Sequence, residues 1–207
     1  MKNRNDMRRP GPSRAPKPLF LIACEGSRTE RDYFEDLNKK HGRPVVLDFV
    51  KTGADPKTLV EHAAKARKMR RDEFPEVWVI YDCDDHKRLL DAGQQARDNK
   101  LRVAFSNPCF ELWALLHFQD QTAHIDRHKL RAVCQTHMPG YDKMLPCDTL
   151  IPLTDSAEER AVALRKRHDR NQTAGENPST DVDQLVRRIL SAAGSTSPLD
   201  TPVIARC

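Results

Sequence analysis

Short apolar runs alternate with amphipathic stretches through the first half of the chain. Each run is too short for a buried helix and is bounded by polar or turn residues, so it predicts a buried strand. The four predicted strands are residues 19–24, 45–50, 77–81 and 101–105. Helices are predicted between them, at about 27–40, 55–73 and 86–99. Strands that alternate with helices of this length indicate an α/β fold with a parallel sheet and right-handed crossovers.

Local signals mark where two of these helices begin. Ser27 is followed by Glu30 three residues later, which is the spacing of a capping box. The capping box is a sufficient structural role for Glu30, with a part in a functional site as the alternative. Asp55 precedes Pro56, the order expected of an N-cap residue and a first-turn proline.

The pattern changes after residue 105, where helices replace the alternation. Residues 109–118 are apolar on every side, which predicts a buried helix. Further helices are predicted at about 127–138, 156–170 and 181–192, with a loop at 139–152. We expect this half to be a helical elaboration of the sheet domain and not a second domain.

The charge of the chain is concentrated at its start. Of the net charge of +5, residues 1–17 carry six basic side chains and one acidic side chain, so the other 190 residues are balanced. This proline-containing segment is expected to be a disordered basic tail, either touching nucleic acid non-specifically or only aiding solubility. The predicted organisation is a tail at 1–17, one domain at 18–192 and a flexible C-terminal tail at 193–207.

Two absences narrow the class of protein. No apolar run approaches the ~18 residues of a membrane span, so no membrane association is expected. The six cysteines are scattered and include no Cys-x-x-Cys pair. A reduced, cytoplasmic protein is the simplest interpretation of that cysteine usage.

Acidic residues follow two of the predicted strands. Glu25 comes directly after the first strand, and Asp82, Asp84 and Asp85 come after the third. The carboxyl ends of parallel strands open onto one crevice, and hard divalent cations prefer oxygen ligands. The sequence therefore predicts a Mg²⁺ or Mn²⁺ site held by Glu25, Asp82 and Asp84. Asp85 either caps the next helix or supplements Asp84.

Other polar residues are weaker candidates. Glu111 lies in the apolar helix, where a carboxylate is costly unless it is bound to a metal or paired with an arginine. His117 is more simply a core histidine. Lys51, after the second strand, is either a phosphate contact or a solvated side chain. The basic run 165–167, which includes Lys166, either holds a nucleic-acid backbone or covers a solvated helix face.

A second set of possible metal ligands lies in the helical half of the chain. The ligand types of zinc occur at His124, His128, Cys134 and His137, but their spacing matches no standard zinc module. A solvated amphipathic helix is the preferred interpretation of this segment.

A set of motifs occurs in one order between residues 19 and 190. It comprises Cys24-Glu25-Gly26-x-x-Thr29-Glu30-x-x-Tyr33-Phe34, Asp82-x-Asp84, Ser106-Asn107-Pro108-Cys109-Phe110-Glu111-Leu112-Trp113, His117-Phe118 and Asn177-Pro178-Ser179-Thr180. In this order the motifs resemble the RloB-like proteins, which accompany bacterial restriction and abortive-infection loci. The segment that ends at Trp113 is the most specific of them.

The resemblance implies a Toprim-like fold, in which helices flank a small parallel sheet. Carried over by position, Glu25, Asp82 and Asp84 are the metal-binding and catalytic acids. The resemblance also implies that Asn107, Glu111 and Asn177 line the site, with Glu111 among the catalytic candidates. It further implies a role in phage defence as a metal-dependent nuclease acting on DNA, or on RNA including tRNA, often beside an ABC- or AAA-type ATPase encoded nearby.

Other functions explain less of the pattern. A phosphatase of the haloacid-dehalogenase type uses Asp-x-Asp after its first strand and would leave Glu25 without a role. A receiver domain would carry an acidic pair after the first strand. A non-catalytic adaptor or sensor subunit of a defence ATPase complex stays open, with residues 109–118 and the later helices as its interface. The chain has no P-loop motif, so it is not expected to hydrolyse ATP itself.

Overall fold

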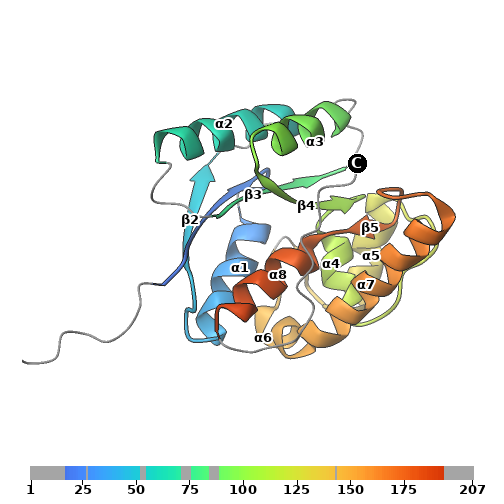
Figure 1. Cartoon of the computed structure of the whole chain (residues 1–207). Helices are drawn as coiled ribbons and strands as arrows, with labels where there is room; N and C mark the ends of the chain where they lie inside the picture. Colours follow the sequence, from blue (N-terminus) through green and yellow to red (C-terminus); the bar gives the residue numbers. More distant parts are fainter. Residues whose placement is uncertain are drawn as a thin grey trace, which may run out of the picture.

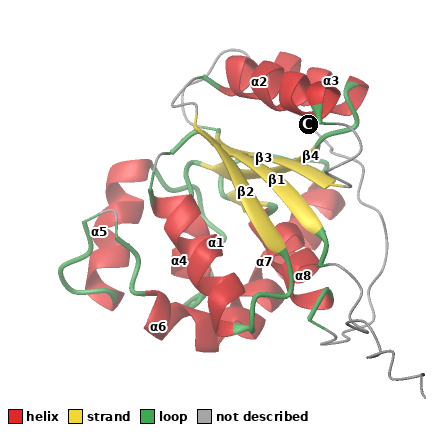
Figure 2. Ribbon diagram, turned by 90° about the vertical axis from the view of Figure 1, so that its left-hand side faces the viewer, coloured by secondary structure: helices red, strands yellow, loops and turns green. Residues whose placement is uncertain are grey.

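The computed structural model describes residues 17–26, 28–51, 55–70, 76–83, 89–142 and 144–193. The predicted N-terminal tail and nearly all of the predicted C-terminal tail lie outside these ranges. Within them, helices cover both faces of a central sheet, as Figures 1 and 2 show. The architecture is the predicted α/β class and is consistent with a Toprim-like fold.

The sheet has five strands in the order β2-β1-β3-β4-β5. The first four are mutually parallel, and β5 runs antiparallel to β4. The strands are β1 (Leu19–Cys24), β2 (Val46–Lys51), β3 (Glu76–Asp82), β4 (Arg102–Asn107) and β5 (Ser179–Thr180). The four predicted strands are therefore confirmed to within one or two residues, and β5 was not predicted.

The helices divide unequally between the two faces. Helices α2 (Pro56–Met69) and α3 (Leu89–Asp98) cover one face, and the remaining helices gather on the other (Figure 1). The second group is α1 (Thr29–Lys40), α4 (Glu111–Leu116), α5 (Arg127–His137), α6 (Cys147–Leu150), α7 (Thr154–Asn171) and α8 (Val182–Ser191), with a 3-10 turn at Ile151–Leu153. The later helices thus extend the sheet domain, as the sequence predicts.

Alternation along the strands supplies an apolar core to each layer. In β1, Phe20 and Ile22 pack toward the larger helical layer, while Leu21 and Ala23 pack toward α2 and α3. All four side chains are at most 2% exposed. The strand ends are therefore held rigidly between two packed layers.

Some helix boundaries differ from those predicted. Asp55 caps α2, since its Oδ1 accepts from the backbone N–H of Lys57 at 3.2 Å. The helix predicted at 109–118 is shorter, Glu111–Leu116, and its residues from Leu112 onward are buried. The part of the adaptor interface predicted at residues 109–118 is wrong, because residues 112–116 are buried in the core. The later helices stay a prediction in that role. Residues 147–152 are helical where a loop was predicted.

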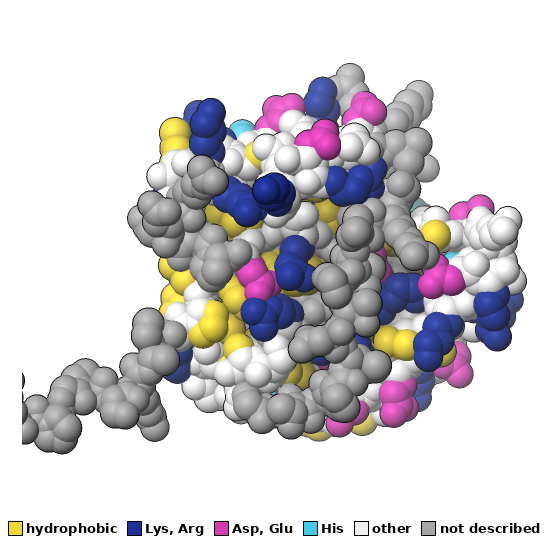
Figure 3. Space-filling view, in the orientation of Figure 1, with side chains coloured by type: hydrophobic (Ala, Val, Ile, Leu, Met, Phe, Trp, Pro, Cys, Tyr) yellow, Lys and Arg dark blue, Asp and Glu magenta, His cyan; other side chains and the backbone are white. Residues whose placement is uncertain are grey.

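The charged side chains at the surface and the cysteines are arranged as the balanced charge and scattered cysteines of the sequence suggest. On the face shown in Figure 3, basic and acidic side chains are interspersed. No disulfide joins any of the cysteines in the described ranges. None of the helices that the structure describes is long and apolar enough to cross a membrane.

Candidate metal and catalytic site

The ends of β1 and β3 bring the first two predicted acids together. These strands are neighbours, with Cys24 level with Ile80, and the backbone N–H of Glu25 donates to the Ile80 carbonyl at 3.0 Å. The backbone N–H of Asp82 in turn donates to Glu25 Oε2 at 3.3 Å. Glu25 and Asp82 therefore meet at the carboxyl edge of the sheet, where the sequence placed them.

Glu30 lies at the same place, which favours the site role that the sequence left as its alternative. Helix α1 begins at Thr29 with Arg28 as its N-cap residue, and Ser27 lies outside the described residues, so the predicted capping box is not seen. Glu30 is only 6% exposed. Its carboxylate lies against Gly26, where an added Cβ would come within 2.1 Å of Glu30 Oε2. Among the described residues, that oxygen has no hydrogen-bond partner.

Glu111 joins this group from the first residue of α4. Tyr141 donates its hydroxyl hydrogen to Glu111 Oε1 at 3.0 Å, and Cys134 Sγ donates to the Glu111 carbonyl at 3.4 Å. Within the described part of the chain no arginine or lysine forms an ion pair with Glu111. The alternative that Glu111 is neutralised by an arginine is thus not what the structure shows.

We call Glu25, Glu30, Asp82 and Glu111 the acid cluster, because their charges act on one another. Burial is the main cause that raises the pKa of Asp82 well above its usual value, followed by the charges of Glu30, Glu111 and Glu25. The guanidinium of Arg127 acts in the opposite direction. The pKa of Glu30 is raised mainly by burial, and further by Glu111 and Glu25. Like charges held together in this way favour binding of a proton or a cation.

The donor chemistry fits a hard cation. The acid cluster offers carboxylate oxygens alone, including one buried oxygen without a partner, and Mg²⁺ and Mn²⁺ prefer such ligands. No three His, Cys, Asp or Glu side chains in the described ranges are already arranged around one point as metal ligands. Asp84 and Asp85 lie outside the described residues. The magnesium or manganese site therefore stays a prediction.

Both predicted site-lining asparagines are engaged with the backbone of nearby loops. Asn107 donates from Nδ2 to the Gly175 carbonyl at 2.9 Å. Asn177 forms two bonds to Ile125, accepting from its N–H at 2.9 Å and donating to its carbonyl at 2.8 Å. These contacts fasten the segment before β5 to the rest of the fold. They explain both asparagines structurally, and a substrate contact stays a prediction.

The two basic residues predicted to contact substrate, Lys51 and Lys166, lie on different elements of the fold. Lys51 ends β2 and is level with Cys24 of β1, so its backbone lies at the same edge of the sheet as Glu25. Lys166 is exposed on α7. Its neighbour Arg165 forms ion pairs with Asp181 and Asp183, so this member of the basic run stabilises the fold.

The histidines have structural explanations where the structure describes their contacts. His117 is buried, with Nδ1 2.9 Å from the Trp113 carbonyl oxygen, and burial lowers its pKa to about 4. His137 stacks on Phe118, while Cys134 is buried against α4. The alternative zinc site therefore gains no support.

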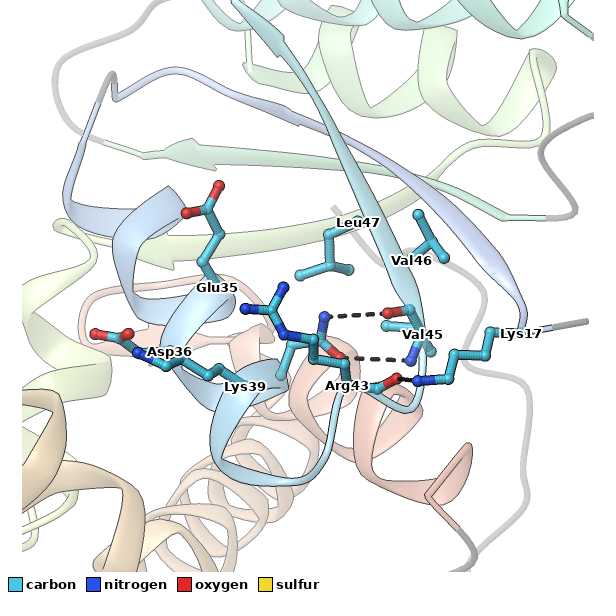
Figure 4. Close-up of a pocket in the computed structure, with 9 residues that line it drawn as sticks. Lys17, Glu35, Asp36, Lys39, Arg43, Val45, Val46 and Leu47 are labelled. Atoms are coloured by element: carbon cyan, nitrogen blue, oxygen red, sulfur yellow. Dashed lines mark hydrogen bonds between the residues drawn. The ribbon is translucent and has the colours of Figure 1, made fainter.

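A pocket lies at the opposite end of the sheet from the acid cluster. It has a volume of about 540 Å³ and forms where the end of α1 meets the start of β2 (Figure 4). Asn38 is one of its lining residues and forms hydrogen bonds with both backbone groups of Val45, at 3.1 and 3.4 Å. None of the predicted site residues lines this pocket, so it is separate from the acid cluster.

Comparison with known proteins agrees with the motifs. Residues 20–189 match the family model described as RloB-like protein. No match was found among curated proteins or among solved structures. The matched range covers the five strands, apart from the first residue of β1, and the acid cluster. The chain therefore belongs to the RloB-like family.

Proposed function

We propose that this protein is a Mg²⁺- or Mn²⁺-dependent nuclease that acts as an effector in defence against phage. The observation that carries the proposal is the acid cluster at the carboxyl ends of β1 and β3. Its members approach closely, yet no ion pair within the described residues neutralises Glu30, Asp82 or Glu111. Such a site binds cations, and nucleases use bound cations to cleave phosphodiesters.

Each acid has a distinct part in the proposed site. Glu25, Asp82 and Asp84 would hold the cation, which supplies Lewis-acid stabilisation and an activated water when bound. Glu25 is oriented by the backbone N–H of Asp82, and Glu111 is oriented by the Tyr141 hydroxyl. A base role for Glu25 requires that it accept a proton from the attacking water.

The substrate is a nucleic acid, either DNA or RNA including tRNA. Lys51 lies at the correct edge of the sheet for its backbone to approach a bound phosphate, and Lys166 is an exposed cation on α7. Activity is expected in the cytoplasm, and a neighbouring ABC- or AAA-type ATPase is the proposed partner and trigger.

A cleavage assay tests the proposal. Purified protein is incubated with plasmid DNA or total tRNA, with Mg²⁺, Mn²⁺ or a chelator. We expect metal-dependent cleavage that falls at least about 100-fold in Asp82→Asn, because a metal ligand is lost. The matched control is Asp98→Asn, which alters an exposed carboxylate on α3. Full cleavage by Asp82→Asn would contradict the assignment.

The adaptor alternative gives a different result in cells. If the chain only holds an ATPase, Asp82→Asn would protect against phage as well as the unaltered protein does. If the nuclease proposal is correct, protection is lost although the variant still binds its partner. The assay is repeated with the ATPase if the protein alone cleaves neither substrate.

A further inference from the structure

Helix α5 lies beside the acid cluster, although it belongs to the helical half of the chain. Cys134 of this helix donates from Sγ to the Glu111 carbonyl at 3.4 Å. Tyr141, in the segment that follows the helix, donates its hydroxyl hydrogen to Glu111 Oε1 at 3.0 Å. The helix and the residues after it are therefore joined at two points to Glu111, a member of the acid cluster.

Arg127, the first residue of α5, lies on the face of this helix that is turned toward the cluster. It precedes Cys134 by seven residues, which is about two helical turns, so the two residues share one face. Leu130 and Cys134 on that face are buried, whereas Arg127 is exposed. Its charge reaches the buried groups, because it opposes the rise in the pKa of Asp82 and of Cys109. Arg127 thus lies at the border between the acid cluster and solvent.

The backbone around Arg127 is firmly held. Asp126 caps the helix, since its Oδ1 accepts from the backbone N–H groups of His128 at 3.0 Å and Lys129 at 2.9 Å. Asn177 bonds to both backbone groups of Ile125, two residues before Arg127. A side chain that projects from a fixed backbone loses less conformational freedom when it binds a ligand. The start of α5 is therefore a preorganised place for a charged contact.

A nucleic acid that reaches the acid cluster brings further negative charge to it. Carboxylates repel a phosphodiester, so a positive group at the border favours its approach. The guanidinium of arginine carries its charge on a planar fork of donors that matches two oxygens of one phosphate. Lys129, in the same turn, lies about 200° around the helix from Arg127 and so on a different face. Position and chemistry together single out Arg127.

We propose that Arg127 is a substrate-binding residue that contacts a phosphate of the nucleic acid at the acid cluster. This inference rests on the proposed function, since it adds a protein group to the same site. It also gives the helical half of the chain a part in recognition. The sequence-based candidates for this contact, Lys51 and Lys166, lie on β2 and α7 instead.

Nucleic-acid binding tests the inference without relying on cleavage. Every protein compared carries Asp82→Asn, and binding of fluorescent tRNA and of a fluorescent DNA duplex is followed by anisotropy at several KCl concentrations with constant Mg²⁺. We expect Arg127→Ala to weaken binding at least about fivefold at low salt. The slope of log K against log salt should become shallower by up to about 1, because one phosphate contact is lost.

Two further variants make this measurement specific. Arg127→Lys keeps the charge but not the planar fork, so it should recover the salt slope and only part of the affinity. Lys129→Ala is the matched control, because it removes an exposed cation from the same turn on another face. It should change the affinity less than about twofold. Thermal unfolding of each variant shows whether the fold is retained, and Arg127→Lys carries the test if Arg127→Ala is destabilised.

The outcomes separate this inference from the proposed function. Equal affinities and salt slopes in Arg127→Ala and Lys129→Ala would overturn the contact. If Arg127 behaves as expected but the chain with an intact Asp82 cleaves nothing, alone or with the ATPase, the nuclease proposal fails and the contact stands. Absence of binding to either nucleic acid would overturn both.

Discussion

Two groups of buried or partly buried acids in this protein differ in how their negative charge is compensated. The first is the acid cluster at the ends of β1 and β3. The second, which we call the paired cluster, consists of Arg165 of α7 with Asp181 and Asp183 at the start of α8. Asp183 is fully buried, yet Arg165 bonds to both of its oxygens and to Asp181 Oδ1 at 2.5 Å.

The difference shows that buried acids alone do not indicate a functional site. In the paired cluster the protein supplies its own cation, and the two carboxylates and one guanidinium form a closed structural unit. In the acid cluster the described residues supply no ion pair to Glu30, Asp82 or Glu111. A cation from outside the chain is the compensation that this second arrangement favours.

The largest expected effect comes from opening the paired cluster. Arg165→Ala leaves Asp183 buried and uncompensated, so the free energy of unfolding should fall by about 3–5 kcal/mol. Denaturant unfolding followed by circular dichroism measures the loss. The adjacent Lys166→Ala removes an exposed cation and should change stability by less than about 0.5 kcal/mol. If the two substitutions changed stability equally, Arg165 would not be the group that compensates the buried charge of Asp183, and the contrast with the acid cluster would fail.

A second, smaller effect is a loss of stability at acidic pH that His117 causes. It must be separated from the titration of the two clusters before their stabilities are compared at low pH. His117 is buried beside Tyr33 and Trp113, and its pKa is lowered to about 4 mainly by burial, with Arg160 also lowering it. Between pH 6.5 and 4 the unfolded chain binds a proton at this position that the folded chain does not. The free energy of unfolding should therefore fall as the pH drops through this window, by at most about 3 kcal/mol.

The acid cluster contributes with the opposite sign. A carboxylate whose pKa is raised in the folded state binds its proton there first, so its contribution to stability rises as the pH falls. Comparison of unfolding curves for the unaltered protein and His117→Gln isolates the histidine. A pH slope that is unchanged in His117→Gln would show that another group causes it.

The smallest expected effect is on the free energy of unfolding when one carboxylate in each cluster is replaced by its amide. This pair of substitutions compares the two clusters most directly. Without divalent cations, Glu30→Gln should raise the free energy of unfolding by about 1 kcal/mol, because it removes a like charge from a buried group. Asp183→Asn should lower it by about 1–3 kcal/mol, because a charged bond to Arg165 is lost. Thermal unfolding in the presence of a chelator measures both. If Glu30→Gln instead lowers the free energy of unfolding, the charge of the Glu30 carboxylate is already compensated by a group of the protein.

Much of the site could be predicted because it depends on strand ends. The apolar runs 19–24 and 77–81 predict two strands of one parallel sheet, and the residues that follow such strands share an edge. Glu25 and Asp82 meet there as expected. Glu111 could also be singled out, since a carboxylate in an otherwise apolar helix needs a special explanation.

The rest depends on contacts between distant residues. Strand β5 has only two residues and exists because Ser179 and Thr180 pair with Asn107 and Ser106, which no local periodicity reveals. Glu30 fits a capping box equally well in sequence, and only its position over Gly26 shows where its carboxylate lies. The run 165–167 has one charge sign throughout, yet Arg165 turns inward because its acidic partners lie 16 and 18 residues later.

The short antiparallel strand has a consequence for truncated forms of the chain. β4 pairs with β3 on one side and with β5 on the other, and Ser106 Oγ also lies 2.9 Å from Thr180 Oγ1. A product that ends before Ser179 would free the end of β4, at Ser106 and Asn107, next to the strand that carries Asp82. Exposed edges recruit other strands, so shortened products should self-associate more than the complete chain, in which the two-residue strand β5 covers this part of β4.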